Sequence, residues 1–273
     1  MPDFSGIFIL TDLDGTLLGP DTLVSEENRA AARYFMEHGG LFSFATGRSR
    51  PGAAHFADIP VNAPAVLNNG SYGFNFISGR DSYVWDVNRA DSLRLMGLVS
   101  HAFPHCGIEV ICADGPWVVR NNAAVERHMR YIKVGTRQVS PEEIDGQWIS
   151  LGVLAEPELM PDITVWAKQR FGERFFIQQS MPHFLEIQRP GAHKGAGALE
   201  LCRQLGVRPE NLYTVGDGAN DIELLEATQN RFAPANACDA VLALSPTLLP
   251  SNDGHILPAL IEIIAARCAQ PSR

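Results

Sequence analysis

The sequence predicts an α/β protein in which a core with a parallel sheet is interrupted by an inserted α+β domain. Near both ends of the 273-residue chain, short apolar runs alternate with helical patterns, which is typical of parallel strands joined by crossover helices. Several of these runs stop abruptly in carboxylate, hydroxyl or glycine residues, as buried strands do when their carboxyl ends reach a site. Between these parts lies a stretch of domain length in which helices and strand-like runs are mixed. We therefore expect a core formed by residues 1–80 and 187–273 and an insert formed by residues 81–186.

The first core strand is expected in residues 7–18, which read IFILTDLDGTLL. Its apolar run ends at Asp12 and Asp14, and a Gly-Thr turn follows. Two like charges this close repel, so one carboxylate would be driven toward protonation unless a cation lies between them. A hard divalent ion bound by oxygens resolves this, and Mg²⁺ suits a site that also binds phosphate. The alternative is a strand that simply runs into an Asp-rich turn.

A helix and a second strand follow. Ser25 is a suitable N-cap for a helix that ends at Gly39-Gly40. A second buried strand, Leu41–Ala45, then runs into Thr46-Gly47-Arg48. Strand, helix and strand form a right-handed crossover, so both strand ends should open on one edge of the sheet.

The next elements lead into the insert. A short helix is expected at Pro51–Phe56, and a third strand, Ala65–Leu67, ends in Asn68-Asn69-Gly70. Aromatic residues then alternate on both sides of Ser78-Gly79-Arg80, which predicts a hairpin. The expected elements of the insert are the helices Arg89–Phe103, Ala123–Tyr131 and Glu156–Phe171 and the strands Ile108–Cys112, Trp117–Arg120, Trp148–Ala155, Phe175–Ser180 and Phe184–Gln188.

The α/β alternation resumes after the insert. Lys194–Leu205 is a helical segment closed by Gly206. The buried strand Leu212–Val215 runs into residues 216–221, which read GDGAND. The last expected elements are a helix at Ile222–Ala227, a strand at Arg231–Ala233 and a terminal helix at His255–Cys268.

Composition limits the classes of function. The net charge of −9 argues against a nucleic-acid or anionic-membrane surface. The five cysteines form no CxxC pair, so structural disulfides and a zinc site are not expected and a reducing compartment is favoured. No basic segment precedes the first apolar run and no apolar stretch is long enough to span a bilayer. We expect a cytoplasmic protein without nucleic-acid or membrane partners, and the sequence leaves monomer and dimer open.

Four polar clusters stand where a predicted strand ends or a helix begins. They are Asp12–Thr16, Thr46–Arg48, Lys194-Gly195 and Gly216–Asp221. Ligands of open parallel sheets bind outside the carboxyl ends of the strands, so the clusters should meet in one crevice. Each cluster alone is compatible with an ordinary turn, a helix cap or a solvated lysine. Their compatible order along one sheet favours a site.

The chemistry of the clusters suits phosphoryl transfer. Asp12 is the expected nucleophile, because a carboxylate can attack phosphorus and form an acyl phosphate. Asp14 would protonate the leaving alcohol and later accept a proton from water. Thr46 contributes a hydroxyl and a backbone N–H, and Lys194 a positive charge, against the phosphoryl oxygens. Asp217 would complete the metal shell.

Further contacts are expected around these residues. Asp221 either binds the metal ion or orients Lys194. Asn220 can donate a hydrogen bond to phosphate, and the backbone N–H groups of Gly15 and Thr16 can join the same cradle.

With these motifs the chain resembles a haloacid dehalogenase (HAD) superfamily phosphatase of the Cof-like type IIB branch. The family motifs are matched by DLDGT at Asp12–Thr16, by Thr46 in FATGR, by Lys194 in HKGAG, and by Asp217 and Asp221 in GDGANDIELL. The resemblance implies a Rossmannoid core, an α+β cap over the site, Mg²⁺, and hydrolysis of a small phosphate ester, such as a sugar phosphate, through an aspartyl phosphate. It implies the roles already assigned to Asp12, Asp14 and Asp217, with Asp14 binding the metal through its backbone carbonyl, and phosphate contacts from Thr46, Gly47 and Lys194.

In such an architecture the insert selects the leaving group. Candidate substrate contacts are Arg48, Asn69 and His183, and the alternative for Arg48 is a pair with an acidic neighbour. Further candidates are other basic residues of the insert, namely Arg120, Arg127, His128, Arg130 and Lys133. For the residues from Arg127 to Lys133, a solvated helix face is the favoured alternative. Two other functions remain open, a phosphomutase resembling the phosphomannomutases and a phosphosugar-binding regulator without turnover. Release of inorganic phosphate would indicate the phosphatase, transfer of the phosphate group would indicate the mutase, and the absence of both would indicate the regulator.

Overall fold

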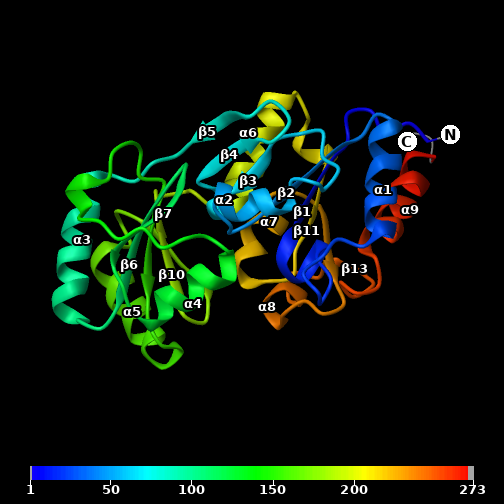
Figure 1. Ribbon diagram of the computed structural model, residues 1–273. Coiled ribbons are helices and arrows are strands. Elements are labelled where there is room, and N and C mark those ends of the chain that lie inside the picture. Colours follow the sequence, from blue (N-terminus) through cyan, green and yellow to red (C-terminus); the bar gives the residue numbers. More distant parts are fainter. Residues whose placement is uncertain (1, 270–273) are drawn as a thin grey trace.

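The structure, a computed structural model, describes residues 2–269, so the ends of the expected core at residues 1 and 270–273 lie outside it. The described chain forms one sheet of eight strands and one of five. Figure 1 shows them as two lobes, between which the chain passes twice. The predicted α/β class is confirmed: a large, mainly parallel sheet forms one part, and the second sheet is separate and antiparallel.

The eight-stranded sheet has the strand order β13-β12-β11-β1-β2-β3-β4-β5. Its pairings are parallel except for β3 with β4 and β4 with β5, which form the predicted hairpin region. The strands are β1 (Phe8–Asp12), β2 (Leu41–Ala45), β3 (Ala65–Leu67), β4 (Tyr72–Asn75), β5 (Arg80–Val84), β11 (Leu212–Val215), β12 (Asn230–Pro234) and β13 (Thr247–Leu249). The strands that carry Asp12 and precede Thr46 and Asp217 are therefore adjacent at the centre.

Helices cover both faces of this sheet, and the alternation of side chains along β1 explains how. Ile9 packs in a cluster with Phe35 of α1 and Leu260 of α9. Phe8 packs on the opposite face with Leu201 of α6. Figure 1 shows α1 and α9 side by side at one end of the molecule. The helices of this lobe are α1 (Glu26–Glu37), α2 (Arg50–Ala53), α6 (Lys194–Leu205), α7 (Ile222–Glu226), α8 (Asp239–Leu242) and α9 (Ile256–Cys268).

The five-stranded sheet has the order β7-β6-β8-β10-β9 and is antiparallel throughout. One of its faces is buried: Val110 of β6 and Leu185 of β10 pack against Leu95 of α3 and Ile163 of α5. Its elements are α3 (Arg89–Ala102), β6 (Gly107–Cys112), β7 (Gly115–Arg120), α4 (Ala123–Ile132), β8 (Ser150–Leu154), α5 (Met160–Phe171), β9 (Phe176–Met181) and β10 (Phe184–Gln188). Part of the other face is turned toward the eight-stranded sheet.

The predicted helix ends agree with the structure. The Ser25 side chain accepts a hydrogen bond from the N–H of Asn28, and Gly39 and Gly206 take left-handed φ values of +91° and +68° after α1 and α6. The helix α8 and the edge strand β13 have no counterpart in the sequence prediction, because four and three residues are too few to show a period. Within residues 2–269, no helix combines the length and apolar content needed to cross a bilayer.

Candidate active site

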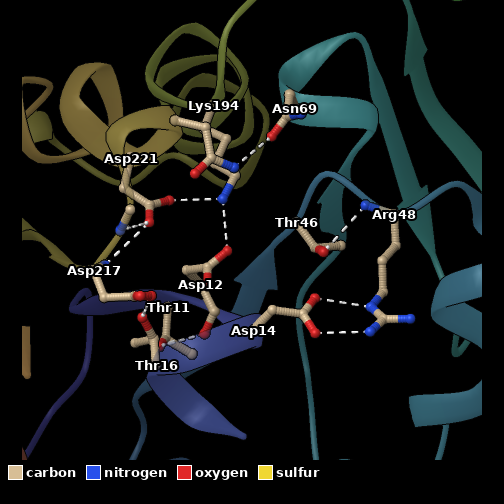
Figure 2. A network of polar contacts seen from close by, with 12 residues as sticks. Thr11, Asp12, Asp14, Thr16, Thr46, Arg48, Asn69, Lys194, Asp217 and Asp221 are labelled. Atoms are coloured by element: carbon tan, nitrogen blue, oxygen red, sulfur yellow. Dashed lines mark hydrogen bonds and ion pairs between the residues drawn. The ribbon is translucent and has the colours of Figure 1, made fainter. Parts of the chain in front are cut away.

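A buried lysine joins two carboxylates at the centre of the site (Figure 2). Lys194, fully buried in the first turn of α6, donates to Asp12 Oδ1 and to Asp221 Oδ1, with Nζ to oxygen distances of 2.6 Å. The His193 side chain caps this helix by accepting from the N–H of Ala196, which fixes where Lys194 begins the helix. Burial opposes the charge of Lys194, but the two carboxylates outweigh it and raise its pKa. Lys194 is therefore a fixed cation beside Asp12.

The loop after β11 is organised by Asp221. Its Oδ2 accepts hydrogen bonds from the backbone N–H groups of Asp217 and Gly218 at 3.1 and 3.0 Å, while Oδ1 binds Lys194. Gly216 has no room for a side chain, because an added Cβ would lie 2.5 Å from the Asp221 Cβ. Both oxygens of Asp221 are thus engaged within the protein, which favours the orienting role expected for it.

Asp217, in the loop after β11, contacts the loop that follows β1. The Thr16 hydroxyl donates to Asp217 Oδ1 at 2.6 Å. Gly15 has a φ of +86°, and a Cβ added there would clash with the Asp217 carboxylate, so this position requires glycine. Burial raises the pKa of Asp217 to about 6, and nearby Asp221 adds to the effect.

The residues present fit a divalent cation. Ligand oxygens of Asp12, Asp217 and Asp221 lie within 4.8 Å of one another. Lys194 offsets one of these three negative charges, so the cluster has surplus negative charge that a hard cation would neutralise. The pKa of Asp12 is raised well above its ordinary value by burial first and then by Asp221.

Thr46 contributes less than the sequence suggested. Its backbone N–H donates to the Val66 carbonyl at 2.8 Å within the sheet, so the expected amide contact with phosphate is not available. Its hydroxyl accepts from the N–H of Arg48 at 3.2 Å. A strand pairing that continues past the last residue of β2 explains the difference, and the hydroxyl remains the group through which Thr46 can bind a ligand.

The side chain of Asp14 is held by Arg48. The guanidinium donates from Nε to Oδ2 at 2.8 Å and from Nη2 to Oδ1 at 2.7 Å (Figure 2). Tyr131, at the end of α4 in the smaller lobe, donates its hydroxyl to Asp14 Oδ1 at 3.2 Å, and its ring lies 5.0 Å from the guanidinium. Phe56 lies at the same distance from the guanidinium. The contact ties the two lobes together at the rim of the site.

We expect Arg48→Lys to lower the free energy of unfolding by about 1 to 2 kcal/mol, because an ammonium group cannot reproduce two parallel hydrogen bonds to one carboxylate. The Arg33–Glu26 pair is a matched control, since its N–O distance of 2.8 Å is similar but both side chains are far more exposed. Arg33→Lys should cost less than about 0.5 kcal/mol. Urea denaturation measures both, and equal effects would contradict the special role of the buried pair.

A cavity of about 280 Å³ lies between the lobes, with Asp12, Asp14 and Asp217 on its wall. Gly47, Asn69 and Asn220 also line it, and the Asn220 side chain donates to Asn69 Oδ1 at 3.0 Å. Thr46 and Lys194 lie behind this wall, buried but in contact with lining residues. His183 is not among the lining residues; His128, whose ring centroid is 6.1 Å from that of His183, lines the cavity in its place.

Three titratable lining residues of the smaller lobe were not identified from the sequence. Tyr131 gives no signal there, because a tyrosine at a helix end is ordinary. Glu109 and Glu186 do give a sequence signal, because each is an acidic residue inside an otherwise apolar strand. Both are buried in the structure. Strand register, which a single sequence does not provide, places both on the cavity side.

Comparison with known proteins gives the family. The profile of the haloacid dehalogenase-like hydrolases matches residues 9–256. Endoribonuclease YBEY, chloroplastic, of Arabidopsis thaliana is 30% identical over 268 residues, covering 92% of this chain and 45% of that protein. This chain thus spans less than half the length of that relative. The 5-amino-6-(5-phospho-D-ribitylamino)uracil phosphatase YcsE of Bacillus subtilis (strain 168) is 26% identical over 247 residues, covering 89% of this chain and 90% of that protein.

Solved structures agree on the fold. The HAD subclass IIB sugar phosphatase BT4131 superposes with a TM-score of 0.80 over 95% of this chain and 99% of that one, at 20% sequence identity. At this identity the likeness shows the fold, while the profile and the sequence relatives carry the family. The chain therefore belongs to the haloacid dehalogenase-like hydrolase family, as its motifs predicted.

Proposed function

We propose that this protein is a Mg²⁺-dependent cytoplasmic phosphatase that hydrolyses a small phosphate monoester through an aspartyl phosphate on Asp12. The observation that carries the proposal is the environment of Asp12, which lines the cavity with a buried cation on one of its oxygens and two further carboxylates nearby. Lys194 occupies Oδ1, which leaves the other oxygen of Asp12 to attack phosphorus.

The first half-reaction exchanges one bond to phosphorus for another. The free oxygen of Asp12 bonds to phosphorus, the bond from phosphorus to the leaving-group oxygen breaks, and that oxygen takes a proton from Asp14. Arg48 now donates to both oxygens of Asp14, so the leaving group must displace one of these contacts to reach the acid. Lys194 and the Thr46 hydroxyl stabilise charge on the phosphoryl oxygens.

The second half-reaction restores the enzyme. Water attacks phosphorus, its proton passes to Asp14, and the bond between phosphorus and Asp12 breaks to release inorganic phosphate. Asp12, Asp217 and the backbone carbonyl of Asp14 would hold the metal ion, with Asp221 close by. When bound, Mg²⁺ supplies positive charge against the phosphoryl oxygens.

We propose that the smaller lobe is a cap that closes over the cavity. The boundaries expected from the sequence fall inside β5 and β10, since β5 pairs in the eight-stranded sheet and β10 runs to Gln188. We therefore assign the crossing linkers to residues 85–88 and 189–192. Closure would exclude water while the leaving group is still bound.

Phosphate release tests the function. We expect the protein to release inorganic phosphate from at least one member of a panel of phosphorylated metabolites, and EDTA to lower the rate at least about tenfold until Mg²⁺ is restored. The panel includes 5-amino-6-(5-phospho-D-ribitylamino)uracil, the substrate in the name of the YcsE relative. Analysis of the organic product detects phosphate transfer, which would favour a mutase. No turnover of any ester would favour the binding regulator and contradict the proposal.

A further inference from the structure

Glu109 is a buried carboxyl group for which the described protein supplies no hydrogen-bond partner. Its side chain is fully buried, and neither Oε1 nor Oε2 has a partner among the described residues. It stands in β6 between Ile108 and Val110, both of which point into the core of the cap. An unpaired buried carboxyl is costly, and proteins retain such groups where something else pairs with them. Glu109 lines the same cavity as Asp12, so a bound ligand can be that partner.

A second carboxyl group stands on the same wall. Glu109 and Glu186 are both paired with Gly152 of β8, one from each side, so all three residues face the cavity side of the sheet. Gly152 places no side chain between the two carboxyl groups, and an added Cβ there would meet the Phe184 ring at 2.8 Å. Unlike Glu109, Glu186 is engaged: it accepts from the Asn69 side chain and, at 3.4 Å, from the Ser150 hydroxyl.

Cationic groups that would bind a second anion are missing from this wall. Among the described residues that line the cavity, Arg48 is the one arginine or lysine, and Asp14 already engages its guanidinium. His128 stacks on Phe184, and burial lowers its pKa to about 4, so it is neutral at pH 7. The wall therefore offers hydrogen-bond acceptors and apolar surface, with no free positive charge.

We propose that Glu109 determines substrate specificity by accepting hydrogen bonds from hydroxyl or amino groups of the leaving group, and that the cap wall excludes leaving groups with a second anion. The proposal rests on the phosphatase function and narrows its substrate to monoesters of polyols or amino compounds. A carboxylate only accepts hydrogen bonds, so donors on the leaving group satisfy it and a phosphate or carboxylate there repels it. Burial raises the pKa of Glu109 to about 8, so the esters are compared above pH 8, where the group is ionised, and a donor from the ligand favours the same form at lower pH.

Matched esters test the proposal on the wild-type protein. The probes are ethyl and pentyl phosphates whose far end is a methyl, hydroxyl, ammonium or carboxylate group, so that the two lengths place this group at two distances from the phosphate. We expect a terminal hydroxyl or ammonium group to raise kcat/KM at least about tenfold over methyl, because hydrogen bonds to charged groups contribute this much. A terminal carboxylate should lower kcat/KM below the methyl value.

The variant Glu109→Gln separates recognition from structure. It should remove most of the preference for ammonium over methyl and relieve the penalty of carboxylate relative to methyl, because an uncharged amide neither pairs with a cation nor repels an anion. Glu158→Gln, at an exposed glutamate of the same cap, should change neither the preference for ammonium nor the penalty on carboxylate. The melting temperature of Glu109→Gln should equal or exceed that of the wild type, because a buried unpaired acid is removed.

The outcomes are distinct. Turnover of the esters without preference for donors, or an equal loss on all esters in Glu109→Gln, overturns the role of Glu109 and leaves the phosphatase function standing. Preference for the carboxylate-ended ester also overturns it. Failure to hydrolyse any ester, including the wider panel, overturns both.

Discussion

Asp12→Asn should lower kcat for phosphate release by at least about 1,000-fold, because the amide oxygen is too weak a nucleophile to form the phosphoryl bond. The fold should tolerate the change. Lys194 retains its 2.6 Å contact with Asp221, and the amide carbonyl can still accept at the position of Oδ1. Because Asp12 is 4% exposed and its pKa is raised by burial, removing its charge also relieves the repulsion among three carboxylates.

The measurement is single-turnover phosphate release with saturating Mg²⁺, together with a thermal melt of the same preparation. Asp145→Asn, at an exposed aspartate of the cap, is the matched control and should keep full activity. Mass spectrometry of the acid-quenched wild-type enzyme should find the added phosphoryl group on the peptide that contains Asp12. Activity within tenfold of wild type in Asp12→Asn would show that another group attacks phosphorus.

The core of the site could be predicted because buried parallel strands leave a clear pattern. β1, β2 and β11 are apolar runs with a sudden polar end, and these ends supply Asp12, Thr46 and Asp217. Parallel pairing of β1 with both neighbours then brings the ends together without any knowledge of side-chain contacts. Only the helix that begins with Lys194 depended on a weaker signal, since a lone lysine at a helix start is usually solvated.

The cap side of the site could not be predicted in the same way. Which residues of an antiparallel strand face a cavity depends on register, and a shift of one residue moves every side chain to the other face. The prediction of substrate contacts therefore relied on the basic residues of the insert. In the structure Arg120 donates to backbone carbonyls of Cys106 and Phe103, and Arg127 forms an exposed ion pair with Glu156.

The pairing of Asp14 with Arg48 illustrates a second limit. The sequence placed both residues at neighbouring strand ends but could not show that Arg48 binds the candidate acid. Tyr131 from the cap joins this pair, so the position of the cap and the environment of Asp14 are physically connected. Such a contact depends on how the two lobes pack against each other, and nothing in local sequence records it.

Lys194→Met should have the largest combined effect on stability and activity. The lysine is fully buried between two carboxylates, and removing its charge leaves Asp12 and Asp221 buried without their cation. Breaking a buried pair in this way costs about 3 to 5 kcal/mol of unfolding free energy. Lys168→Met, at an exposed lysine of α5, is the control and should change stability by less than about 0.5 kcal/mol.

The loss of unfolding free energy in Lys194→Met should depend on pH. Without Lys194, the folded-state pKa of Asp12 rises further above its unfolded value, since the buried cation that lowers it is gone. A carboxyl group with a raised folded pKa stabilises the fold at pH values below its unfolded pKa and loses that contribution as pH rises. The deficit of Lys194→Met in unfolding free energy should therefore be larger at pH 8 than at pH 5.

Activity measured below the melting temperature should still fall at least about 1,000-fold, because the cation beside the phosphoryl group is lost. A variant with wild-type stability at pH 8 would show that the carboxylates do not depend on Lys194, and the electrostatic account of the site would have to be abandoned.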